Sequence, residues 1–419
     1  MDKIIVNGGK QLNGKVKIGG AKNAVLPIMT ACILAPGKYT ITNVPDLRDT
    51  RTMSELLRRI GADVKYENNI LQINTKNCNS PEAPYELVKT MRASFYVLGP
   101  LLSRFGISKV SLPGGCAWGP RPVNYHIEAL EKLGANIELN NGYIVAKGNL
   151  KGEEITFKNT SVGATGNTLM AAVKASGTTK INNAAIEPEI SLLCNFLKKM
   201  GAEISGVGTK TLTIRGVTEL KSVNLFKIIP DRIEAGTFLI ATAMTGGSVE
   251  LIDVNSNHLK CVLDNLVVAG SEIDISDNNI KINSSKIVNP VSIVTAPYPG
   301  FPTDLQAQWM ALMTISKGQS NITDEVYLDR FTHVSELNRL GANIKLNKNK
   351  AFINGVSFLK SAQLMSTDIR ASASLIISAL SAKGISEISR VYHIDRGYEK
   401  IENKFRKLGA NIWRESEKK

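Results

Sequence analysis

The sequence lacks the patterns that most metal-binding, disulfide-bonded and membrane proteins show. Its 5 cysteines include no Cys-x-x-Cys pair, and its 4 histidines form no His-Glu-x-x-His motif. These absences argue against a disulfide framework and a catalytic metal. No segment has the roughly 18 consecutive apolar residues of a membrane-spanning helix, and the first residues carry charges and glycines where a signal peptide needs an apolar core. We therefore expect a cytoplasmic protein with reduced thiols and no insertion into a membrane.

Aromatic residues are also scarce, at 6%, whereas the formal net charge is +14. A positive charge of this size suits anionic partners. A nucleic-acid-binding protein would need clustered Lys and Arg with aromatic side chains for base stacking, but the basic residues here are dispersed along the chain. The composition therefore favours small anionic ligands and no nucleic acid.

The sequence does contain a motif that recurs about every 70 residues, a period longer than that of common solenoid repeats. An amphipathic helix ends at a glycine, and a strand follows at once. The motif occurs as LLRRIGADV, LEKLGANIEL, LKKMGAEIS, LVVAGSEIDI, LNRLGANIKL and FRKLGANIW. The glycines are Gly61, Gly134, Gly201, Gly270, Gly341 and Gly409. Each glycine is predicted to adopt the left-handed conformation that ends a helix.

A second, nearly apolar helix begins about forty residues before each of these glycines and is predicted to be buried. These segments are GAKNAVLPIM, TMRASFYVLG, VGATGNTLMA, DRIEAGTFLI, TDLQAQWMAL and TDIRASASLI. A glycine-containing turn and a β-rich run separate the two helices. The sequence therefore predicts an α/β protein of six repeated units of βαβαββ type.

A chain of 419 residues exceeds the usual size of one core, so we expect two domains of three units each. The sixth unit lacks one strand of its hairpin, while the first twenty residues contain two strands that belong to no unit. The simplest arrangement sends the N-terminal strands to the last unit. Residues 1–20 and 230–419 would then form one discontinuous domain, and residues 21–229 the other.

Charged and polar residues recur at the predicted N-termini of the buried helices and in the neighbouring loops. If the units pack about a threefold axis, these positions converge at one end of each domain, facing the other domain across a cleft. Helix N-termini and arginines both bind anions. The alternative is that each Asp only caps its helix and each Arg pairs with it. The residues are Lys22, Asn23, Arg48, Arg92, Ser161, Val162, Gly163, Glu187, Glu189, Asp231, Asp304, Arg330, Asp368, Arg370 and Arg396.

Cys116 differs from the other cysteines because it lies in LPGGCAWGPRPVN, a Gly/Pro-rich stretch without apolar periodicity. Cys32, Cys194 and Cys261 lie on apolar helices and are expected in the core. A thiol near Arg121 in a loop is expected to be reactive. His126 follows closely, but no protease signature surrounds it, and we expect a structural or substrate-facing role.

The residues then reveal a resemblance that runs from end to end of the chain. AKNA at 21–24, KTMRAS at 89–94, PGGC with GPRPV at 113–123, SVGAT at 161–165, PDRIEAGTF at 230–238, FPTDLQAQ at 301–308, TDIRASASL at 367–375 and HIDRGYEKIE at 393–402 resemble the UDP-N-acetylglucosamine 1-carboxyvinyltransferases. The resemblance implies an inside-out α/β barrel. It implies transfer of the enolpyruvyl group of phosphoenolpyruvate to the 3′-hydroxyl of UDP-N-acetylglucosamine, the first committed step of peptidoglycan synthesis, without metal or cofactor. We also expect a monomer or a weak homo-oligomer.

The resemblance also implies a role for individual residues. Cys116 corresponds to the proton donor and covalent phosphoenolpyruvate site, and Asp304 to the base beside the sugar hydroxyl. Contacts to phosphoenolpyruvate are implied for Lys22, Asn23, Arg121 and Arg396, and of these Lys22 and Arg396 are also expected to be catalytic. Arg48 is expected to bind substrate as well. Contacts to the nucleotide sugar are implied for Arg92, Arg121, Pro122, Val123, Asn124, Tyr125, Ser161, Val162, Gly163 and Val326. Arg330, Asp368 and Arg370 are expected to support the reacting centre.

Three positions depart from the family pattern. Arg48 stands where the family commonly has Lys, which keeps the charge, whereas Asn124 replaces an acidic residue and Asn159 a frequently basic one. These two changes affect the expected recognition of uracil and diphosphate. Among related enzymes the nearest alternative is the shikimate-phosphate enolpyruvyl transferase, but that enzyme lacks the PGGC loop.

Overall fold

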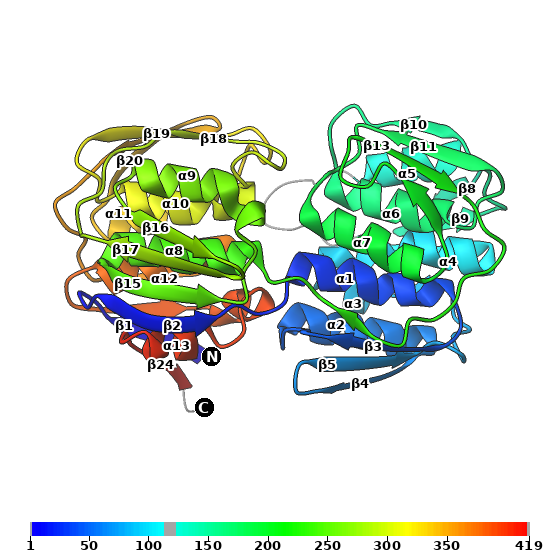
Figure 1. Cartoon of the computed structure of the whole chain (residues 1–419), viewed down its shortest axis with the longest axis horizontal. Coiled ribbons are helices and arrows are strands. Elements are labelled where there is room, and N and C mark those ends of the chain that lie inside the picture. The colour runs from blue at the N-terminus through cyan, green and yellow to red at the C-terminus, as the bar shows by residue number, and fades with distance from the viewer. Residues whose placement is uncertain (1, 113–122, 417–419) are drawn as a thin grey trace. The chain divides into compact units, whose positions relative to one another are not determined.

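The computed structural model describes residues 2–112 and 123–416. The chain divides into two compact units, which we call unit 1 (Met1–Gly19 with Pro230–Lys419) and unit 2 (Gly20–Ile229). Figure 1 draws the helices and strands of both units, and each unit has its own hydrophobic core. None of the helices in the described residues is long and apolar enough to cross a membrane.

Six modules of one design build the two units. A module runs strand, helix, strand, helix, strand, strand, and its four strands form one sheet in the order first, second, fourth, third. The first two strands are parallel, because a buried helix crosses between them, and the remaining pairs are antiparallel. The expectation of repeated βαβαββ units is therefore confirmed. The six sheets stay separate and do not close into one continuous barrel.

Unit 2 contains three of these sheets. Their strands, in sheet order, are β14 (Phe226–Lys227), β3 (Lys38–Thr42), β5 (Ile70–Asn74) and β4 (Asp63–Glu67); β6 (Glu82–Ala83), β7 (Ile107–Ser111), β9 (Tyr143–Lys147) and β8 (Asn136–Asn140); and β10 (Glu154–Thr156), β11 (Thr178–Asn182), β13 (Thr211–Arg215) and β12 (Glu203–Ser205). The helices are α1 (Lys22–Ala31), η1 (Cys32–Leu34), α2 (Arg48–Ile60), α3 (Tyr85–Val88), η2 (Arg92–Val97), α4 (Leu98–Phe105), α5 (Asn124–Lys132), α6 (Val162–Ala172) and α7 (Pro188–Lys199).

Unit 1 repeats the arrangement. Its strands are β2 (Leu12–Lys17), β15 (Gly247–Ile252), β17 (Asn279–Ser284) and β16 (Glu272–Ser276); β18 (Ile293–Thr295), β19 (Gln319–Asp324), β21 (Lys350–Asn354) and β20 (Asn343–Asn347); and β22 (Gln363–Met365), β23 (Ile385–Ser389), β1 (Asp2–Asn7) and β24 (Asn411–Ser416). Its helices are α8 (Arg232–Thr245), η3 (Ser256–Leu259), α9 (Lys260–Val268), η4 (Thr303–Leu305), α10 (Gln306–Met313), α11 (His333–Arg339), α12 (Ile369–Ser381), η5 (Val391–Arg396) and α13 (Ile401–Lys407).

Strands from distant parts of the chain complete three modules. β1 pairs with both β23 and β24 and so supplies the hairpin strand that the last module lacks. β2 does not join it there, contrary to the expectation for the N-terminal strands, because it pairs in parallel with β15 and leads the module of α8. In unit 2, β14 comes from the end of the unit and leads the module of α1.

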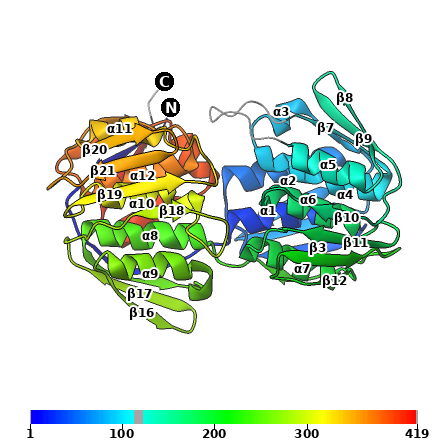
Figure 2. The same cartoon turned by 90° about the horizontal axis from the view of Figure 1, so that it is seen from above.

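The first helix of each module is buried, as its apolar sequence predicts. In unit 1, α8, α10 and α12 pack against one another between the sheets (Figure 2). Every residue of α10 is buried. In unit 2, α6 packs against α4, and α1 packs against η2, the 3₁₀ turn that precedes α4. The second helix of each module ends one or two residues before its predicted glycine.

The six glycines that end these helices all have positive φ, between 88° at Gly341 and 105° at Gly61 and Gly201. The amide of Gly61, for example, donates to the carbonyl of Arg58. This left-handed geometry is the one predicted, because a side chain at these positions would be strained.

Candidate active site

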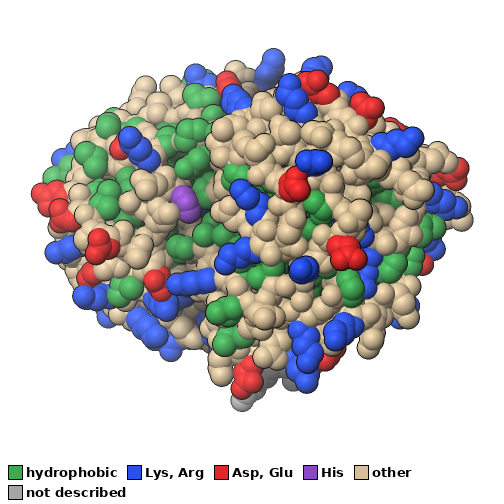
Figure 3. Space-filling view, turned by 45° about the vertical axis from the view of Figure 1, so that its right-hand side comes forward, with side chains coloured by type: hydrophobic (Ala, Val, Ile, Leu, Met, Phe, Trp, Pro, Cys, Tyr) green, Lys and Arg blue, Asp and Glu red, His purple; other side chains and the backbone are tan. Residues whose placement is uncertain are grey.

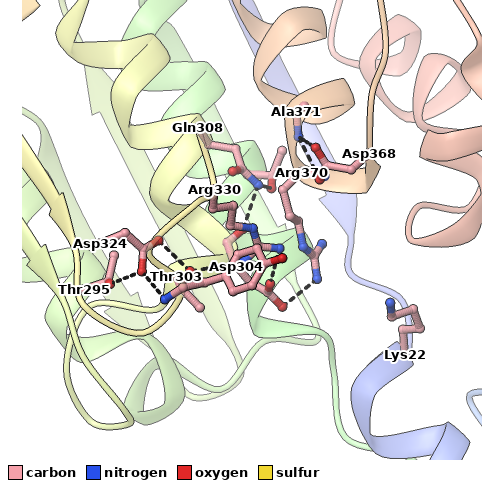
Figure 4. A network of polar contacts seen from close by, with 12 residues as sticks. Lys22, Thr295, Thr303, Asp304, Gln308, Asp324, Arg330, Asp368, Arg370 and Ala371 are labelled. Atoms are coloured by element: carbon pink, nitrogen blue, oxygen red, sulfur yellow. Dashed lines mark hydrogen bonds and ion pairs between the residues drawn. The ribbon is translucent and has the colours of Figure 1, made fainter. Parts of the chain in front are cut away.

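The centre of the candidate site in unit 1 is the carboxylate of Asp304, which lies in η4 just before α10 (Figure 4). Its Oδ1 lies 2.8 Å from Nη2 of Arg330, and its Oδ2 lies 2.9 Å from Nη2 of Arg370. The two guanidinium groups are almost fully buried, whereas the Asp304 side chain is 24% exposed. A carboxylate offers about four lone-pair sites, more than these two contacts use. Asp304 can therefore still accept a hydrogen bond from a bound hydroxyl group.

The guanidinium of Arg370 also contacts a buried hydroxyl group, that of Tyr398, which lies just before α13. Its Nη1 donates to the hydroxyl of Tyr398 at 3.3 Å, and this hydroxyl also lies 2.8 Å from Oγ1 of Thr237 and 3.2 Å from Nε2 of Gln308. Burial opposes the charge of Arg370, but Asp304, with Tyr398 and Asp231, outweighs burial and keeps the pKa of Arg370 above its ordinary value. The guanidinium is thus a fixed positive charge beside Asp304.

The predicted convergence of helix N-termini occurs within unit 1. Asp304, Arg370 and Asp231 come from the starts of the three buried helices and interact electrostatically. Asp231 caps α8 by accepting from the amides of Ile233 and Glu234. Asp304 lies inside η4, after the cap residue Pro302, and pairs with Arg330 and Arg370, so the pairing part of the alternative does apply to it.

Asp368 does act as a cap. Its carboxylate accepts from the amides of Arg370 and Ala371 and so fixes the start of α12 (Figure 4). It therefore supports Arg370 through the backbone. Val326 lies in the loop after β19, with a side chain that is largely exposed, and Arg396 ends η5.

In unit 2, the first turns of α1 and α2 bring Lys22 close to Asp49. The ammonium group of Lys22 lies 3.5 Å from Oδ2 of Asp49, and both side chains are largely buried. Asn23 follows Lys22 in α1, and Arg48 precedes Asp49 in α2. Unit 2 thus places three predicted substrate contacts, Lys22, Asn23 and Arg48, at the starts of its first two helices.

The other predicted contacts of unit 2 gather at the start of α6. Ser161 caps this helix by accepting from the amide of Ala164 at 3.2 Å, and Val162 and Gly163 form its first turn. A Cβ atom on Gly163 would lie 3.1 Å from Nε2 of His126, so the glycine lets the helix approach this ring. The hydroxyl of Tyr96, in η2, donates to the carbonyl of Val162.

His126 is a structural residue. Its Nδ1 lies 3.0 Å from Nδ2 of Asn167, and its ring packs edge-on against Phe95. Burial, together with the charge of Arg92, lowers the pKa of His126 to about 3. The neutral ring therefore serves as packing and not as an acid near pH 7.

Of the remaining predicted contacts described in unit 2, Arg92 begins η2, and the others lie on α5 or directly before it. The hydroxyl of Tyr125 accepts from Nδ2 of Asn159 at 3.2 Å, and Nδ2 of Asn124 donates to Glu128 in the same helix. Val123 directly precedes α5. Asn159 therefore contacts Tyr125, a predicted nucleotide-sugar contact, although Asn159 is not the basic residue that the family frequently has at this position.

Cys116, Arg121 and Pro122 lie outside the described residues. Of the other cysteines, Cys32, Cys78 and Cys194 are buried, and Cys261 is partly buried. Burial raises the pKa of Cys194 to about 12, as expected of an inert core thiol. Within the described ranges, no group of three His, Cys, Asp or Glu side chains could hold a metal ion.

Several residues of the site were not anticipated from the sequence: Thr303, Asp324, Tyr398, Gln308 and Thr237. They hold Arg330, Arg370 and Asp304 in place. Tyr398 and Thr303 lie within the motifs HIDRGYEKIE and FPTDLQAQ, so the motifs pointed to the right segments. The partners themselves lie far apart in sequence, for example 161 positions for Thr237 and Tyr398.

Comparison with known proteins identifies the family of the chain. The family model described as EPSP synthase (3-phosphoshikimate 1-carboxyvinyltransferase) matches residues 6–405. The UDP-N-acetylglucosamine 1-carboxyvinyltransferase of Chloroherpeton thalassium is 55% identical over 99% of this chain and 98% of its own length. That of Prosthecochloris aestuarii is 53% identical over 99% of both chains.

The chain belongs to the EPSP synthase family, among its UDP-N-acetylglucosamine 1-carboxyvinyltransferases.

Solved structures of this family share the fold. The enolpyruvyl transferase NikO from Streptomyces tendae superposes with a TM-score of 0.89 over 99% of this chain and 98% of its own, at 23% identity. An EPSP synthase from Acinetobacter baumannii gives a TM-score of 0.74 over 99% of this chain and 100% of its own, at 17% identity. The family fold predicted from the sequence is therefore confirmed.

Proposed function

We propose that this enzyme transfers the enolpyruvyl group of phosphoenolpyruvate to the 3′-hydroxyl of UDP-N-acetylglucosamine and releases phosphate. The observation that carries the proposal is the similarity, at 51–55% identity over nearly the whole chain, to enzymes named for this reaction. We place the reaction in the bacterial cytoplasm, as the first committed step of peptidoglycan synthesis. Its loss would then impair cell shape and cell division.

The reaction consists of an addition and an elimination. The sugar oxygen forms a bond to C2 of phosphoenolpyruvate, the hydroxyl proton leaves to a base, and C3 gains a proton from an acid. The tetrahedral intermediate then loses phosphate from C2 and a proton from C3, which restores the double bond. One C–O bond forms at C2 and one breaks there, with no net change in oxidation state, so the reaction requires no redox cofactor.

We assign the base to Asp304. The two guanidinium groups fix its carboxylate, which is partly exposed and is a group of the kind that accepts the proton of a hydroxyl. Arg370 and Arg330 also stabilise the negative charge that develops on the substrate during the addition. Asp368 holds the start of α12, from which Arg370 extends.

We assign the acid to Cys116, because a thiol with the reference pKa of about 8.5 is still protonated at pH 7. The same thiol can attack C2 of phosphoenolpyruvate and form the covalent adduct. Lys22, Arg121 and Arg396 supply positive charge for the phosphate and carboxylate groups of phosphoenolpyruvate. The proposal therefore uses residues of both units.

The nucleotide sugar is assigned to the residues around α5 and α6 of unit 2, together with Val326 of unit 1. The N-terminus of helix α6, with Ser161 as its cap, carries the partial positive charge that suits a diphosphate. We also propose that nucleic acid is not a partner: on the face drawn in Figure 3, Lys and Arg side chains are scattered among other residues. A nucleic-acid-binding surface would gather them.

Phosphate release measured with each of two acceptors tests the proposal. Turnover with UDP-N-acetylglucosamine and none with shikimate 3-phosphate is expected, and the reverse result would overturn the assignment. We expect Asp304→Asn to lower kcat by about 10²- to 10⁴-fold, because it loses the base. Asp253→Asn, a change in an exposed ion pair of unit 1, is the matched control and is expected to keep full activity.

The role of Cys116 is tested by mass spectrometry. An epoxide phosphonate such as fosfomycin mimics the charge of phosphoenolpyruvate, and we expect it to alkylate this thiol and add its mass to the intact protein. Cys116→Asp should lose both the adduct and the inhibition. Full sensitivity to fosfomycin in this variant would refute the assignment.

A further inference from the structure

Asp324, the last residue of β19, is a buried carboxylate to which the mechanism above assigns no role. Its side chain is 0% exposed, and no Lys or Arg of the described chain forms an ion pair with it. Taking an unpaired carboxylate out of water is costly unless hydrogen bonds compensate the charge. The hydrogen bonds of Asp324 therefore show which groups compensate its buried charge and which segments it holds in place.

Four hydrogen bonds converge on the Asp324 carboxylate (Figure 4). Its Oδ1 accepts from the hydroxyl of Thr295 at 2.7 Å and from the amides of Val326 and Tyr327 at 3.0 and 2.7 Å. Its Oδ2 accepts only from the hydroxyl of Thr303, at 2.7 Å. The two oxygens thus serve different segments, one the loop after β19 and the other the turn before α10.

The Thr303 hydroxyl connects Asp324 to the reacting centre. A hydroxyl has one proton, and this proton points to Asp324, so the Thr303 oxygen presents its lone pairs to Arg330. Nη1 of Arg330 donates to that oxygen at 3.1 Å, and Nη2 of the same guanidinium lies 2.8 Å from Asp304. Asp324, Thr303, Arg330 and Asp304 therefore form one chain of directed contacts.

The internal repeat provides a comparison for this position. The pairing registers match Ile322 of β19 to Ile41, Val110, Ile181, Leu251 and Ile388 in the other modules. The positions that match Asp324 are therefore Asn43, Leu112, Asn183, Asp253 and Arg390. Asp253 is the other acid in this set, but it is partly exposed and pairs with Lys17, whereas Asp324 is fully buried. Since the strand and its parallel partner form in all six modules, the fold itself does not require a buried carboxylate here. The module that carries Asp304 is the one that has it.

We infer that Asp324 is a positioning residue, which orients Arg330 and Asp304 through the Thr303 hydroxyl and holds the loop of Val326 through its other oxygen. The inference rests on the proposed function, because it takes Asp304 to be the base. Misplacing a catalytic group by about 1 Å costs on the order of 100-fold in rate. A chain of contacts that fixes Asp304 thus affects kcat, although Asp324 itself touches no substrate.

Asp324→Asn is the sharpest variant, because the amide can keep its oxygen at the Oδ1 position and its three hydrogen bonds. The NH₂ group then replaces Oδ2 and donates to Thr303, whose own proton is left without its acceptor. We expect kcat to fall about 10- to 100-fold, with the KM for the nucleotide sugar unchanged. Asp324→Ala also loses the contacts to the Val326 loop, so it should raise this KM as well.

Thr303 provides the second arm of the test. Thr303→Val removes the hydroxyl and should lower kcat as much as Asp324→Asn, whereas Thr303→Ser keeps the hydroxyl and should stay within about threefold of the wild type. The double variant Asp324→Asn with Thr303→Val should be no worse than either single variant. Effects that multiply, or a wild-type kcat in Thr303→Val, would overturn the inference.

Glu402→Gln is the control for loss of a buried carboxylate in unit 1. Glu402 accepts from Nε of Arg414 at 3.0 Å, and its contacts do not include Asp304, Arg330 or Thr303. We expect this variant to lower the melting temperature at least as much as Asp324→Asn but to keep kcat. If both variants lowered kcat in proportion to their loss of stability, Asp324 would be merely structural.

The proposed function is tested first and separately, by phosphate release from the wild-type enzyme with UDP-N-acetylglucosamine. If the enzyme used another acceptor instead, the same variants would be compared with that acceptor. A crystal structure of Thr303→Val answers the question without any substrate. Loss of the 2.8 Å contact between Arg330 and Asp304 supports the inference, and an unchanged contact refutes it.

Discussion

At the scale of the residue, burial decides the charge of two histidines. His333 is buried next to Arg330, and His126 is buried near Arg92. Burial is the larger cause and the arginine charge the smaller one, and together they lower the pKa of each histidine to about 3. The unfolded chain has an ordinary histidine pKa near 6.5. Between these two values the unfolded state binds a proton that the folded state rejects, so stability falls as the pH falls.

Replacing His333 should therefore make unit 1 less sensitive to acid. We expect the free energy of unfolding of the wild type to decrease from about pH 6.5 downward, and each buried histidine to contribute about 1.4 kcal/mol per pH unit. His333→Phe removes one such contribution and keeps a ring against Phe331. Urea unfolding at pH 6.5, 5.5 and 4.5 measures the slope, and equal slopes in both proteins would contradict the assignment.

Tyr398 allows a second prediction at this scale. Its hydroxyl is the shared partner of Thr237, Gln308 and Arg370 inside the core of unit 1. Tyr398→Phe leaves buried polar groups without this partner and should lower the free energy of unfolding by about 1–3 kcal/mol. Because Arg370 is released on one side, kcat should fall as well. Urea unfolding and a phosphate-release assay check both effects; unchanged values would show that Tyr398 is dispensable.

At the scale of the element, the glycine that ends the second helix of each module has a purely conformational role in some modules and a steric one in others. A Cβ on Gly201 would meet no atom within 4 Å. A Cβ on Gly61 would lie 2.9 Å from the carbonyl oxygen of Asn77. Both glycines have a φ of 105°, so alanine would be strained at either position.

The two substitutions should therefore differ in cost. Gly201→Ala is expected to lower the free energy of unfolding by about 1–2 kcal/mol, the cost of a side chain in the left-handed region. Gly61→Ala adds the clash with Asn77 and should cost more. Urea unfolding of both variants measures the difference. An equal cost would show that the backbone near Asn77 moves freely.

Elements also show where local sequence was insufficient. The helices and their glycine caps follow from apolar spacing and from the conformational freedom of glycine, both of which are local. The partner of β2 is not local, because β15 lies more than 200 residues away in the chain. Two N-terminal strands of similar composition cannot be assigned to different sheets by pattern alone.

At the scale of the whole molecule, the two units have separate hydrophobic cores built from comparable aromatic contacts. In unit 2, the ring of Phe196 lies 4.9 Å from that of Phe226. In unit 1, the ring of Phe238 lies 4.7 Å from that of Phe405. Both Phe196 and Phe238 are fully buried. A cavity in either core should weaken mainly the unit that contains it.

Phe196→Ala and Phe238→Ala form a matched pair for this prediction. Each should lower the stability of its own unit by about 3–5 kcal/mol. Hydrogen exchange followed by mass spectrometry reports each unit separately: peptides from α6 should exchange faster in Phe196→Ala, and peptides from α12 in Phe238→Ala. Equal acceleration in both units for either variant would show that the two cores unfold as one.

The amino-acid sequence by itself determined the repeated βαβαββ module, the buried first helices, the glycine caps and the family, because each depends on local patterns or on extended similarity. It also identified Asp304, Arg330 and Arg370 as candidate site residues. Only the tertiary structure decided that Asp304 is held between two guanidinium groups while Asp231 and Asp368 cap helices. The chain of contacts from Asp324 through Thr303 likewise joins segments that meet only in the folded unit. The reason is physical: local patterns decide which backbone conformation a segment adopts, whereas a hydrogen bond between distant side chains exists only once packing has placed donor and acceptor about 3 Å apart.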